Sequence, residues 1–228
     1  MRQGTGERCT FRSRGDVTTT TPIVHVIDDD DSFRTAIARV LQFAGYRVKE
    51  YASAGAFLLH ETARRAPGCI LLDLRMPGPS GLELHEAIAG NEEALPVIFV
   101  SGHGDVNSSV RAMKSGAVDF LTKPVDRETL LAAVNMAIAR DAQRRTQNDR
   151  RHELAARYAT LLPREREVFA QVVAGKLNKH IAAVLGIAER TVKAHRAQVM
   201  VKMQAASVAE LALLAAQLRT DGATPTIQ

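Results

Sequence analysis

Short apolar runs recur between residues 22 and 126, and each is followed by a segment with helical periodicity. The runs, most of them rich in Val and Ile, cover residues 23–27, 46–51, 69–73, 96–100 and 118–122. Such runs are typical of strands that are buried on both faces of a parallel sheet. The intervening helices are expected at residues 32–43, 54–61, 82–89 and 106–114. Five strand-then-helix units predict a doubly wound α/β domain with a five-stranded parallel sheet over residues 22–126.

A fifth helical segment follows Asp126, its expected N-cap, and continues without Pro or Gly to about Tyr158. Its middle is strongly charged and lacks the apolar a and d positions that a coiled coil requires. We therefore interpret residues 127–158 as a helical linker, partly frayed, that acts as a spacer.

The pattern after Pro163 is entirely helical. Amphipathic segments are expected at residues 164–173, 179–185, 189–203 and 208–218, with breaks at Gly175, Gly186 and around Ser207. Four helices in about 65 residues are enough for a small independent domain, which we assign to residues 159–228. Residues 1–21 are rich in Arg, Gly and Thr, lack apolar periodicity, and are interpreted as a disordered tail.

The composition is that of an ordinary globular protein, with 46% hydrophobic and 24% charged residues among 228. No apolar run approaches the roughly 18–20 residues that span a bilayer, and the N-terminus lacks the apolar core of a secretory signal. No membrane partner is therefore expected. The two cysteines, Cys9 and Cys69, do not indicate a disulfide framework, and a cytoplasmic location fits them.

The net charge of +5 is unevenly distributed along the chain. Residues 22–126 carry ten basic and fourteen acidic side chains, whereas residues 127–228 carry sixteen basic and nine acidic ones. This asymmetry indicates two units with different partners. The basic unit is a candidate for binding nucleic acid, although a merely soluble surface can have the same balance.

Carboxylates gather where two of the expected strands end. Asp28–Asp31 follow the first strand and Asp73 ends the third. Because the carboxyl ends of parallel strands form a ligand crevice, two or three of these carboxylates should converge there. Such like charges need a cation between them, and hard oxygen ligands suit Mg²⁺. Asp30 and Asp31 are expected to serve the N-terminus of the first helix instead.

Ser101 ends the fourth strand, and Lys123 with Pro124 follows the fifth. A carboxylate nucleophile, a metal, a hydroxyl and an ammonium at one sheet edge are suited to phosphoryl transfer. The chain has neither a GxxxxGK[ST] motif nor a strand-linked GxGxxG motif, so no nucleotide site is predicted. The phosphoryl donor is then expected to be a histidine of a partner protein.

Four stretches resemble the receiver domain of two-component response regulators of the FixJ type. They are VIDDD at 26–30, LLDLRMPGPSGLEL at 71–84, VSGHGD at 100–105 and GAVDFLTKP at 116–124. The resemblance implies a flavodoxin-like receiver fold with Asp73 as the phospho-acceptor. It also implies a Mg²⁺ site formed by Asp28, Asp29, Asp73 and the backbone carbonyl of Arg75, with Asp29 as a direct ligand.

The same resemblance assigns roles to the other strand ends. It makes Ser101 the switch hydroxyl, Lys123 the phosphoryl-binding lysine and Phe120 the aromatic residue that changes rotamer. The Lys123–Pro124 peptide is expected to be cis. A dimer surface is expected near residues 106–114 and 118–121.

Residues 178–203 have the pattern of a helix, a glycine turn and a second helix, which predicts a helix-turn-helix. Spacing predicts a mutual core of Ile181, Ala182, Leu185, Ile187 and Val192. The second helix is expected to expose Arg190, Lys193, His195, Arg196, Gln198 and Lys202. Such a helix suits the major groove of DNA, although basic residues are also common on ordinary surface helices.

Residues 161–211 resemble the LuxR/NarL class of helix-turn-helix through PREREV, AG, LGI, TVKAH and KM. The resemblance implies that Thr191 and His195 contact the phosphate backbone. It places Lys193, Ala194 and Ala197 at base edges, with Arg196 and Gln198 nearby. Asn178, Lys179 and Lys202 complete the expected DNA contacts, with Lys202 reaching a phosphate at most. The chain departs from the class at Leu162, which cannot cap its helix, and at His180 and Val208.

Together these features predict a cytoplasmic transcriptional regulator that binds double-stranded promoter DNA. A histidine kinase would phosphorylate Asp73, the receiver would form a homodimer, and RNA polymerase would be a further partner. The protein is not expected to be an enzyme beyond catalysing its own aspartyl phosphorylation and dephosphorylation.

Two alternatives remain open at this point. Asp28 and Asp30 mimic the DxD motif of haloacid-dehalogenase-type phosphatases, which turnover of small phosphate esters would reveal. The chain could also be a DNA-binding protein whose receiver only dimerises, in which case Asp73 would be dispensable.

Overall fold

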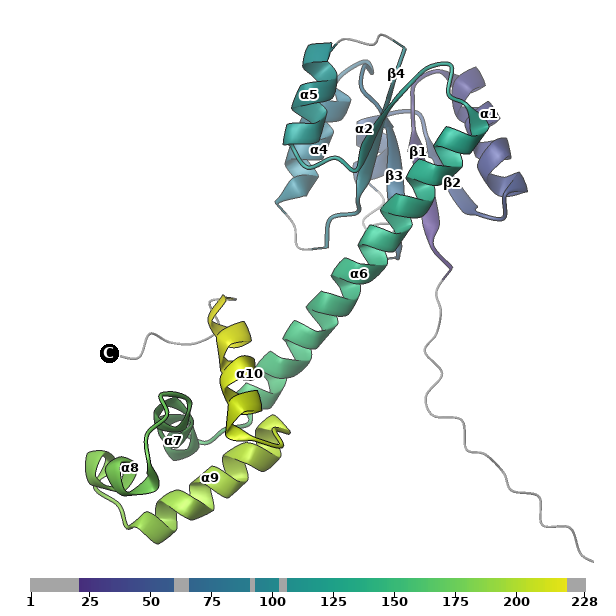
Figure 1. The fold of residues 1–228 in the computed structure, drawn as a ribbon. Coiled ribbons are helices and arrows are strands. Elements are labelled where there is room, and N and C mark those ends of the chain that lie inside the picture. The colour runs from purple at the N-terminus through teal and green to yellow at the C-terminus, as the bar shows by residue number, and fades with distance from the viewer. Residues whose placement is uncertain (1–20, 60–65, 91–92, 103–105, 221–228) are drawn as a thin grey trace, which may run out of the picture. The chain divides into compact units, whose positions relative to one another are not determined.

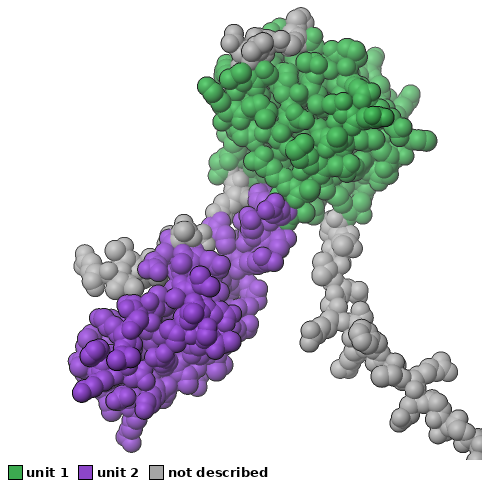
Figure 2. Space-filling model, in the orientation of Figure 1, with its two compact units in different colours: residues 1–142 green, residues 143–228 purple. Residues whose placement is uncertain are grey.

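The protein is described by a computed structural model over residues 21–59, 66–90, 93–102 and 106–220. It divides into two compact units, residues 1–142 and 143–228, which are coloured separately in Figure 2. The division falls within the segment that the sequence predicts to be a linker. The predicted tail lies outside the described residues, apart from Thr21.

The first unit contains a five-stranded parallel sheet in the order β2-β1-β3-β4-β5 (Figure 1). The strands are β1 (Ile23–Ile27), β2 (Arg47–Tyr51), β3 (Gly68–Asp73), β4 (Val97–Ser101) and β5 (Asp119–Thr122). Each lies within one residue of the predicted bounds at both ends. The doubly wound fold is confirmed, and the strand order reverses between β1 and β3, so their carboxyl ends border the ligand crevice.

Helices cover both faces of this sheet. They are α1 (Asp31–Phe43), α2 (Ala54–Leu58), α4 (Gly81–Ala89), α5 (Val106–Lys114) and α6 (Arg127–Ala159). Apolar residues of α1 and α6 pack with Val24 and Val26 on one face, whereas those of α2, α4 and α5 pack with Ile27 on the other. The prediction extended α2 to residue 61, and residues 60–61 lie outside the described part of the chain.

Two aspartates cap helices as predicted. The side chain of Asp30 accepts hydrogen bonds from the backbone N–H groups of Ser32 and Phe33 at the start of α1. Asp126 accepts from those of Glu128 and Thr129 at the start of α6. Each cap satisfies N–H groups that have no partner within the helix.

Helix α6 runs without a break through the predicted linker, so the partial fraying expected there is not found. Its buried stripe of Leu130, Val134 and Ala137 packs against the sheet and ends at Asp141, which is only 1% exposed. Oδ2 of Asp141 accepts a 3.0 Å hydrogen bond from the backbone N–H of Gly68 at the start of β3. The first half of the predicted linker is therefore part of the receiver unit.

The second unit combines the end of α6 with α7 (Pro163–Val173), α8 (Asn178–Leu185), α9 (Glu189–Met203) and α10 (Val208–Thr220). Its core includes Ile181 and Val192, with Ala182, Leu185 and Ile187 packed against it as predicted. The turn between α8 and α9 begins at Gly186, whose φ of 67° is in the left-handed region that favours glycine. The predicted four-helix domain is confirmed.

Within the described residues, no single helix is long and apolar enough to cross a membrane. Helices α9 and α10 reach that length and composition only when they are taken as one pair, which is bent by 62°.

Candidate functional site

Three carboxylates meet at the carboxyl ends of β1 and β3. Asp28, Asp29 and Asp73 each offer an oxygen atom, and these atoms lie within 4.8 Å of one another. Asp28 and Asp73 are buried, whereas Asp29 is exposed. A small group of oxygen ligands that includes one solvent-facing carboxylate fits a cation such as Mg²⁺, which keeps several of its waters. The structure thus brings together the three carboxylates that the sequence assigned to a metal.

The ammonium of Lys123 lies between the two buried carboxylates. It donates a 2.6 Å hydrogen bond to Oδ2 of Asp28 and lies 3.5 Å from Oδ1 of Asp73. It also lies 4.0 Å from the centre of the Phe33 ring, close enough for a cation–π interaction. The Lys123–Pro124 peptide is cis, as predicted. A cation is therefore present beside Asp73 even without a metal.

The carboxyl group of Asp73 is a weaker acid than an ordinary aspartate. Burial, with the charge of Asp28 as the second cause, raises the pKa of Asp73 to about 6, although Lys123 acts in the opposite direction. Burial and the repulsion from the neighbouring carboxylates together outweigh the effect of Lys123. A bound divalent cation would relieve that repulsion, which is the electrostatic reason for a metal at this site.

Two residues that the sequence did not single out hold this site in shape. The guanidinium of Arg34 donates a 2.7 Å hydrogen bond to the backbone carbonyl of Asp28 and forms an ion pair with Asp31. Gly81 starts α4, and a Cβ atom there would lie 2.2 Å from the carbonyl oxygen of Asp73. Only glycine permits this approach of α4 to the end of β3 at Asp73. The glycine is visible in the sequence, but the close contact is not.

The remaining residues predicted for this site lie on neighbouring strands. Val100 pairs with Asp73 in the sheet, so Ser101 is one residue beyond that position, and its side chain is buried. Its backbone carbonyl accepts a 2.8 Å hydrogen bond from the N–H of Lys123. Phe120 is half-buried on β5, and Arg75 is exposed in the loop after Asp73.

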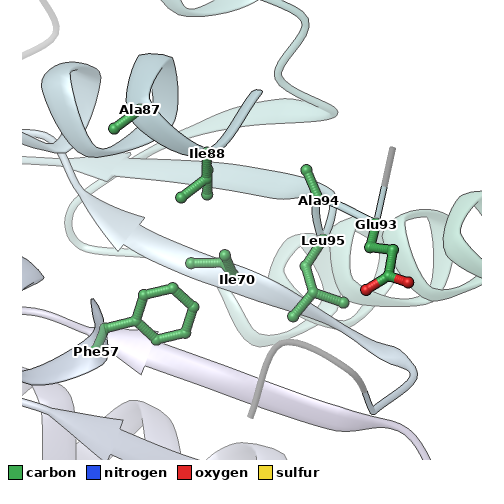
Figure 3. A pocket seen from close by; sticks show the side chains of 7 residues that line it. All are labelled: Phe57, Ile70, Ala87, Ile88, Glu93, Ala94 and Leu95. Atoms are coloured by element: carbon green, nitrogen blue, oxygen red, sulfur yellow. The ribbon is translucent and has the colours of Figure 1, made fainter. Parts of the chain in front are cut away.

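A separate pocket lies near the amino ends of β3 and β4 (Figure 3). It is lined by Phe57, Ile70, Ala87, Ile88, Glu93, Ala94 and Leu95, which are all apolar residues except Glu93. It contains none of the residues predicted for phosphoryl chemistry.

In the second unit, α8 and α9 carry all the residues predicted to contact DNA. Lys193, Ala194, Ala197 and Gln198 are exposed on α9, as the prediction requires. Thr191 and His195 are partly buried, and Lys179 is exposed at the start of α8. Arg196 is partly buried as well, and it donates a 3.0 Å hydrogen bond to the side-chain carbonyl of Asn178. This bond joins the middle of α9 to the first residue of α8.

The structure corrects the prediction that Lys202 is an exposed residue of α9. Its ammonium donates a 2.6 Å hydrogen bond to Oε2 of Glu165 and a 3.2 Å bond to the carbonyl of Thr160. Its side chain is only 26% exposed. This ion pair could not be predicted from the sequence pattern, because its partner, Glu165, lies on a different helix. In the sequence, Glu165 has the pattern of an ordinary acidic residue in the first turn of α7.

Comparison with known proteins identifies the combination of these two units. Residues 24–135 match the response regulator receiver domain family, and residues 159–215 match the luxR family of bacterial regulatory proteins. The transcriptional regulatory protein FixJ of Azorhizobium caulinodans is 48% identical over 206 residues, which are 89% of this chain and 97% of the relative. This chain belongs to the FixJ-type response regulators.

Other relatives of this response regulator support the same architecture. Nodulation protein W of Bradyrhizobium diazoefficiens is 42% identical over 206 residues, with 90% of each chain covered. The solved structure of the response regulator StyR has 39% sequence identity and a TM-score of 0.78, covering 86% of this chain and 99% of StyR. Full-length FixJ from B. japonicum has 39% identity and a TM-score of 0.53, covering 89% of this chain and 99% of that one. The response regulator is therefore a transcriptional regulator of a two-component system.

Proposed function

We propose that a histidine kinase phosphorylates this response regulator on Asp73 and that the phosphorylated protein binds promoter DNA. The observation that carries the proposal is the position of the Lys123 ammonium, 3.5 Å from Asp73 and 2.6 Å from Asp28, in a cluster of three carboxylates. An oxygen of Asp73 attacks the phosphorus. The bond from phosphorus to the donor's imidazole nitrogen then breaks, and that nitrogen takes up a proton.

Asp28, Asp29 and Asp73 would hold Mg²⁺, together with the backbone carbonyl of Arg75. When bound, the cation would neutralise the carboxylates and the oxygens of the incoming phosphoryl group. Arg34 holds the backbone of Asp28 in place through its 2.7 Å hydrogen bond, and so keeps the carboxylate on the acceptor's side.

Lys123 and Ser101 would bind oxygens of the phosphoryl group on Asp73, and Phe120 would change rotamer as Ser101 moves toward that group. The new dianionic group would compete with Asp28 for the Lys123 ammonium. This competition is the local change that would favour the active receiver.

The active receiver would form a homodimer through α5 and β5. On α5, the apolar side chains of Val110 and Met113 are 45% and 48% exposed one helical turn apart, which is consistent with a surface that a second copy covers. A dimer would present two copies of α9 to two half-sites of an operator. RNA polymerase would be a further partner at the promoter.

The protein would work in the cytoplasm, where its kinase and its DNA are accessible. It would catalyse no reaction beyond the phosphorylation and dephosphorylation of its own aspartate. The absence of turnover of small phosphate esters would distinguish it from a phosphatase with the same acidic site.

The experiment is a DNA-binding titration of the full chain with and without acetyl phosphate and Mg²⁺. A duplex selected by the phosphorylated wild-type chain from a random pool serves as the probe. We expect phosphorylation to tighten binding by the wild type and to leave Asp73→Asn unchanged. Equal tightening in both proteins would overturn the proposal, and equally tight binding without phosphorylation would favour a receiver that only dimerises.

A further inference from the structure

The last turn of α9 is fixed to the junction between α6 and α7 by one partly buried ion pair. Lys202 lies near the C-terminal end of α9, and Glu165 lies in the first turn of α7. Their charged atoms are 2.6 Å apart, and the side chain of Glu165 is only 4% exposed. A charge-assisted hydrogen bond is shorter and stronger than a neutral one, and removing one partner of a pair with a buried carboxylate is costly.

The same two residues hold the backbone of the junction. Glu165 accepts a 2.8 Å hydrogen bond from the N–H of Leu162, which has no side-chain cap of its own. Lys202 donates to the carbonyl of Thr160, just after the end of α6. The ion pair therefore joins three segments: the end of α6, the start of α7 and the last turn of α9.

The hydrogen bonds and charges around the pair favour the ionised form of Glu165. The hydrogen bond from Lys202 is the main cause that lowers the pKa of Glu165, and the nearby His195 contributes in the same direction. Glu165 is therefore ionised at neutral pH. Loss of either partner would leave the other charged and poorly solvated.

We propose that the Glu165–Lys202 ion pair positions the recognition helix α9 for DNA, and that Lys202 acts through Glu165 and not through a phosphate. The inference rests on α9 being the helix that reads DNA. The exposed Lys193, Ala194 and Ala197 lie in its first and middle turns, whereas the ion pair holds its C-terminal end. A change in the tilt of α9 would move the reading residues away from the bases even though no DNA-contacting side chain had been removed.

Lys202 could contact a DNA phosphate or position α9. These two roles predict opposite effects of Glu165→Gln on the affinity for DNA. Neutralising an acidic residue in a DNA-binding unit tightens binding by charge alone. A positioning role predicts that Glu165→Gln weakens binding instead. Glu167→Gln is a matched control because it removes the same charge from the same helix. Glu167 pairs with Arg164 at the surface, where the two side chains are 43% and 58% exposed.

The test measures affinity of the full phosphorylated chain for its selected duplex and for a scrambled duplex, at two salt concentrations, well below each variant's unfolding temperature. We expect Glu165→Gln and Lys202→Gln each to lose about fivefold or more on the selected duplex and less on the scrambled one. The double variant should resemble either single variant, because the two changes remove one interaction. Lys202→Arg should restore the wild-type ratio of affinity for the selected duplex to affinity for the scrambled duplex. Glu167→Gln should retain that ratio.

The inference fails if Glu165→Gln binds as tightly as Glu167→Gln. It also fails if Lys202→Gln weakens both duplexes equally and lowers the salt slope by about one, the signature of a lost phosphate contact. If Glu165→Gln does not fold, Lys202→Gln decides alone, with the exposed Lys176→Gln as its control. A wild-type chain that enriches no duplex would overturn the DNA-binding function itself.

Discussion

The ammonium of Lys123 lies 3.5 Å from Oδ1 of Asp73 while it donates a 2.6 Å hydrogen bond to Asp28. The lysine is thus held by a neighbouring carboxylate next to the proposed acceptor. A phosphoryl group on Asp73 adds close to two negative charges within reach of the same ammonium. The balance between Asp28 and the phosphoryl group then decides which of them Lys123 binds.

Lys123→Ala should separate phosphorylation from its consequence. The variant keeps the nucleophile and the three carboxylates, so we expect it to take up phosphate from acetyl phosphate with Mg²⁺. It should not dimerise, because the group that reads the phosphoryl oxygens is gone. Light scattering of phosphorylated protein is the measurement, with the exposed Lys49→Ala as the control. A phosphate-dependent dimer of Lys123→Ala would contradict the mechanism.

Asp73→Asn should stabilise the metal-free protein in a pH-dependent way. The pKa of Asp73 is raised from 3.8 to about 6 on folding, so folding favours its protonated form. That contribution to stability is complete below about pH 4 and is lost as the pH rises through 6. Near pH 8 the ionised carboxylate opposes folding, and asparagine cannot ionise. We expect Asp73→Asn to raise the free energy of unfolding by about 1–3 kcal/mol near pH 8 and by little near pH 4.

Urea unfolding in the presence of a chelator measures this difference, with the exposed Asp149→Asn as the control. Added Mg²⁺ should stabilise the wild type more than Asp73→Asn, because it relieves repulsion that the variant lacks. If Asp73→Asn raised the free energy of unfolding equally at both pH values, the ionised carboxylate would not be destabilised by its surroundings.

Gly81→Ala should damage the acceptor site through the backbone. The new Cβ would lie 2.2 Å from the carbonyl oxygen of Asp73, so α4 or the end of β3 must move. We expect a loss of about 1–3 kcal/mol in stability and slower phosphorylation. Gly90→Ala, where a Cβ would meet no atom within 4 Å, is the control. Wild-type phosphorylation rates in Gly81→Ala would mean that the loop after Asp73 adapts without cost.

Lys193→Ala should reduce sequence discrimination. Lys193 is exposed near the start of α9, where side chains reach base edges. Loss of a base contact costs about 1–3 kcal/mol on the selected duplex and little on other sequences. Titrations of the selected and the scrambled duplex should therefore show a smaller affinity ratio. An unchanged ratio would mean that a different face of α9 enters the groove.

The sequence predicted the strands and most helix bounds because apolar runs, caps and glycines act over a few residues. Asp28, Asp73, Ser101 and Lys123 could be assigned to one edge because parallel strands all end there. The Asp30 and Asp126 caps were likewise predictable from their positions before helices.

Contacts between distant elements could not be predicted in this way. Glu165 and Lys202 belong to helices whose relative position depends on the packing of the whole unit. The buried Asp141 accepts a hydrogen bond from the N–H of Gly68. In the sequence it interrupts an apolar stripe and has the pattern of the charged linker. In both cases the sequence shows a charged residue, but only the fold shows that it is buried and paired.

The most direct test of the account is to locate the phosphoryl group itself. Borohydride reduces an aspartyl phosphate to homoserine, which mass spectrometry of peptides can place at a single residue. After treatment of the full chain with acetyl phosphate and Mg²⁺, we expect homoserine at position 73 and none at positions 28 and 29. Homoserine at position 28 or 29, or equal labelling of Asp73→Asn and the wild type, would contradict it.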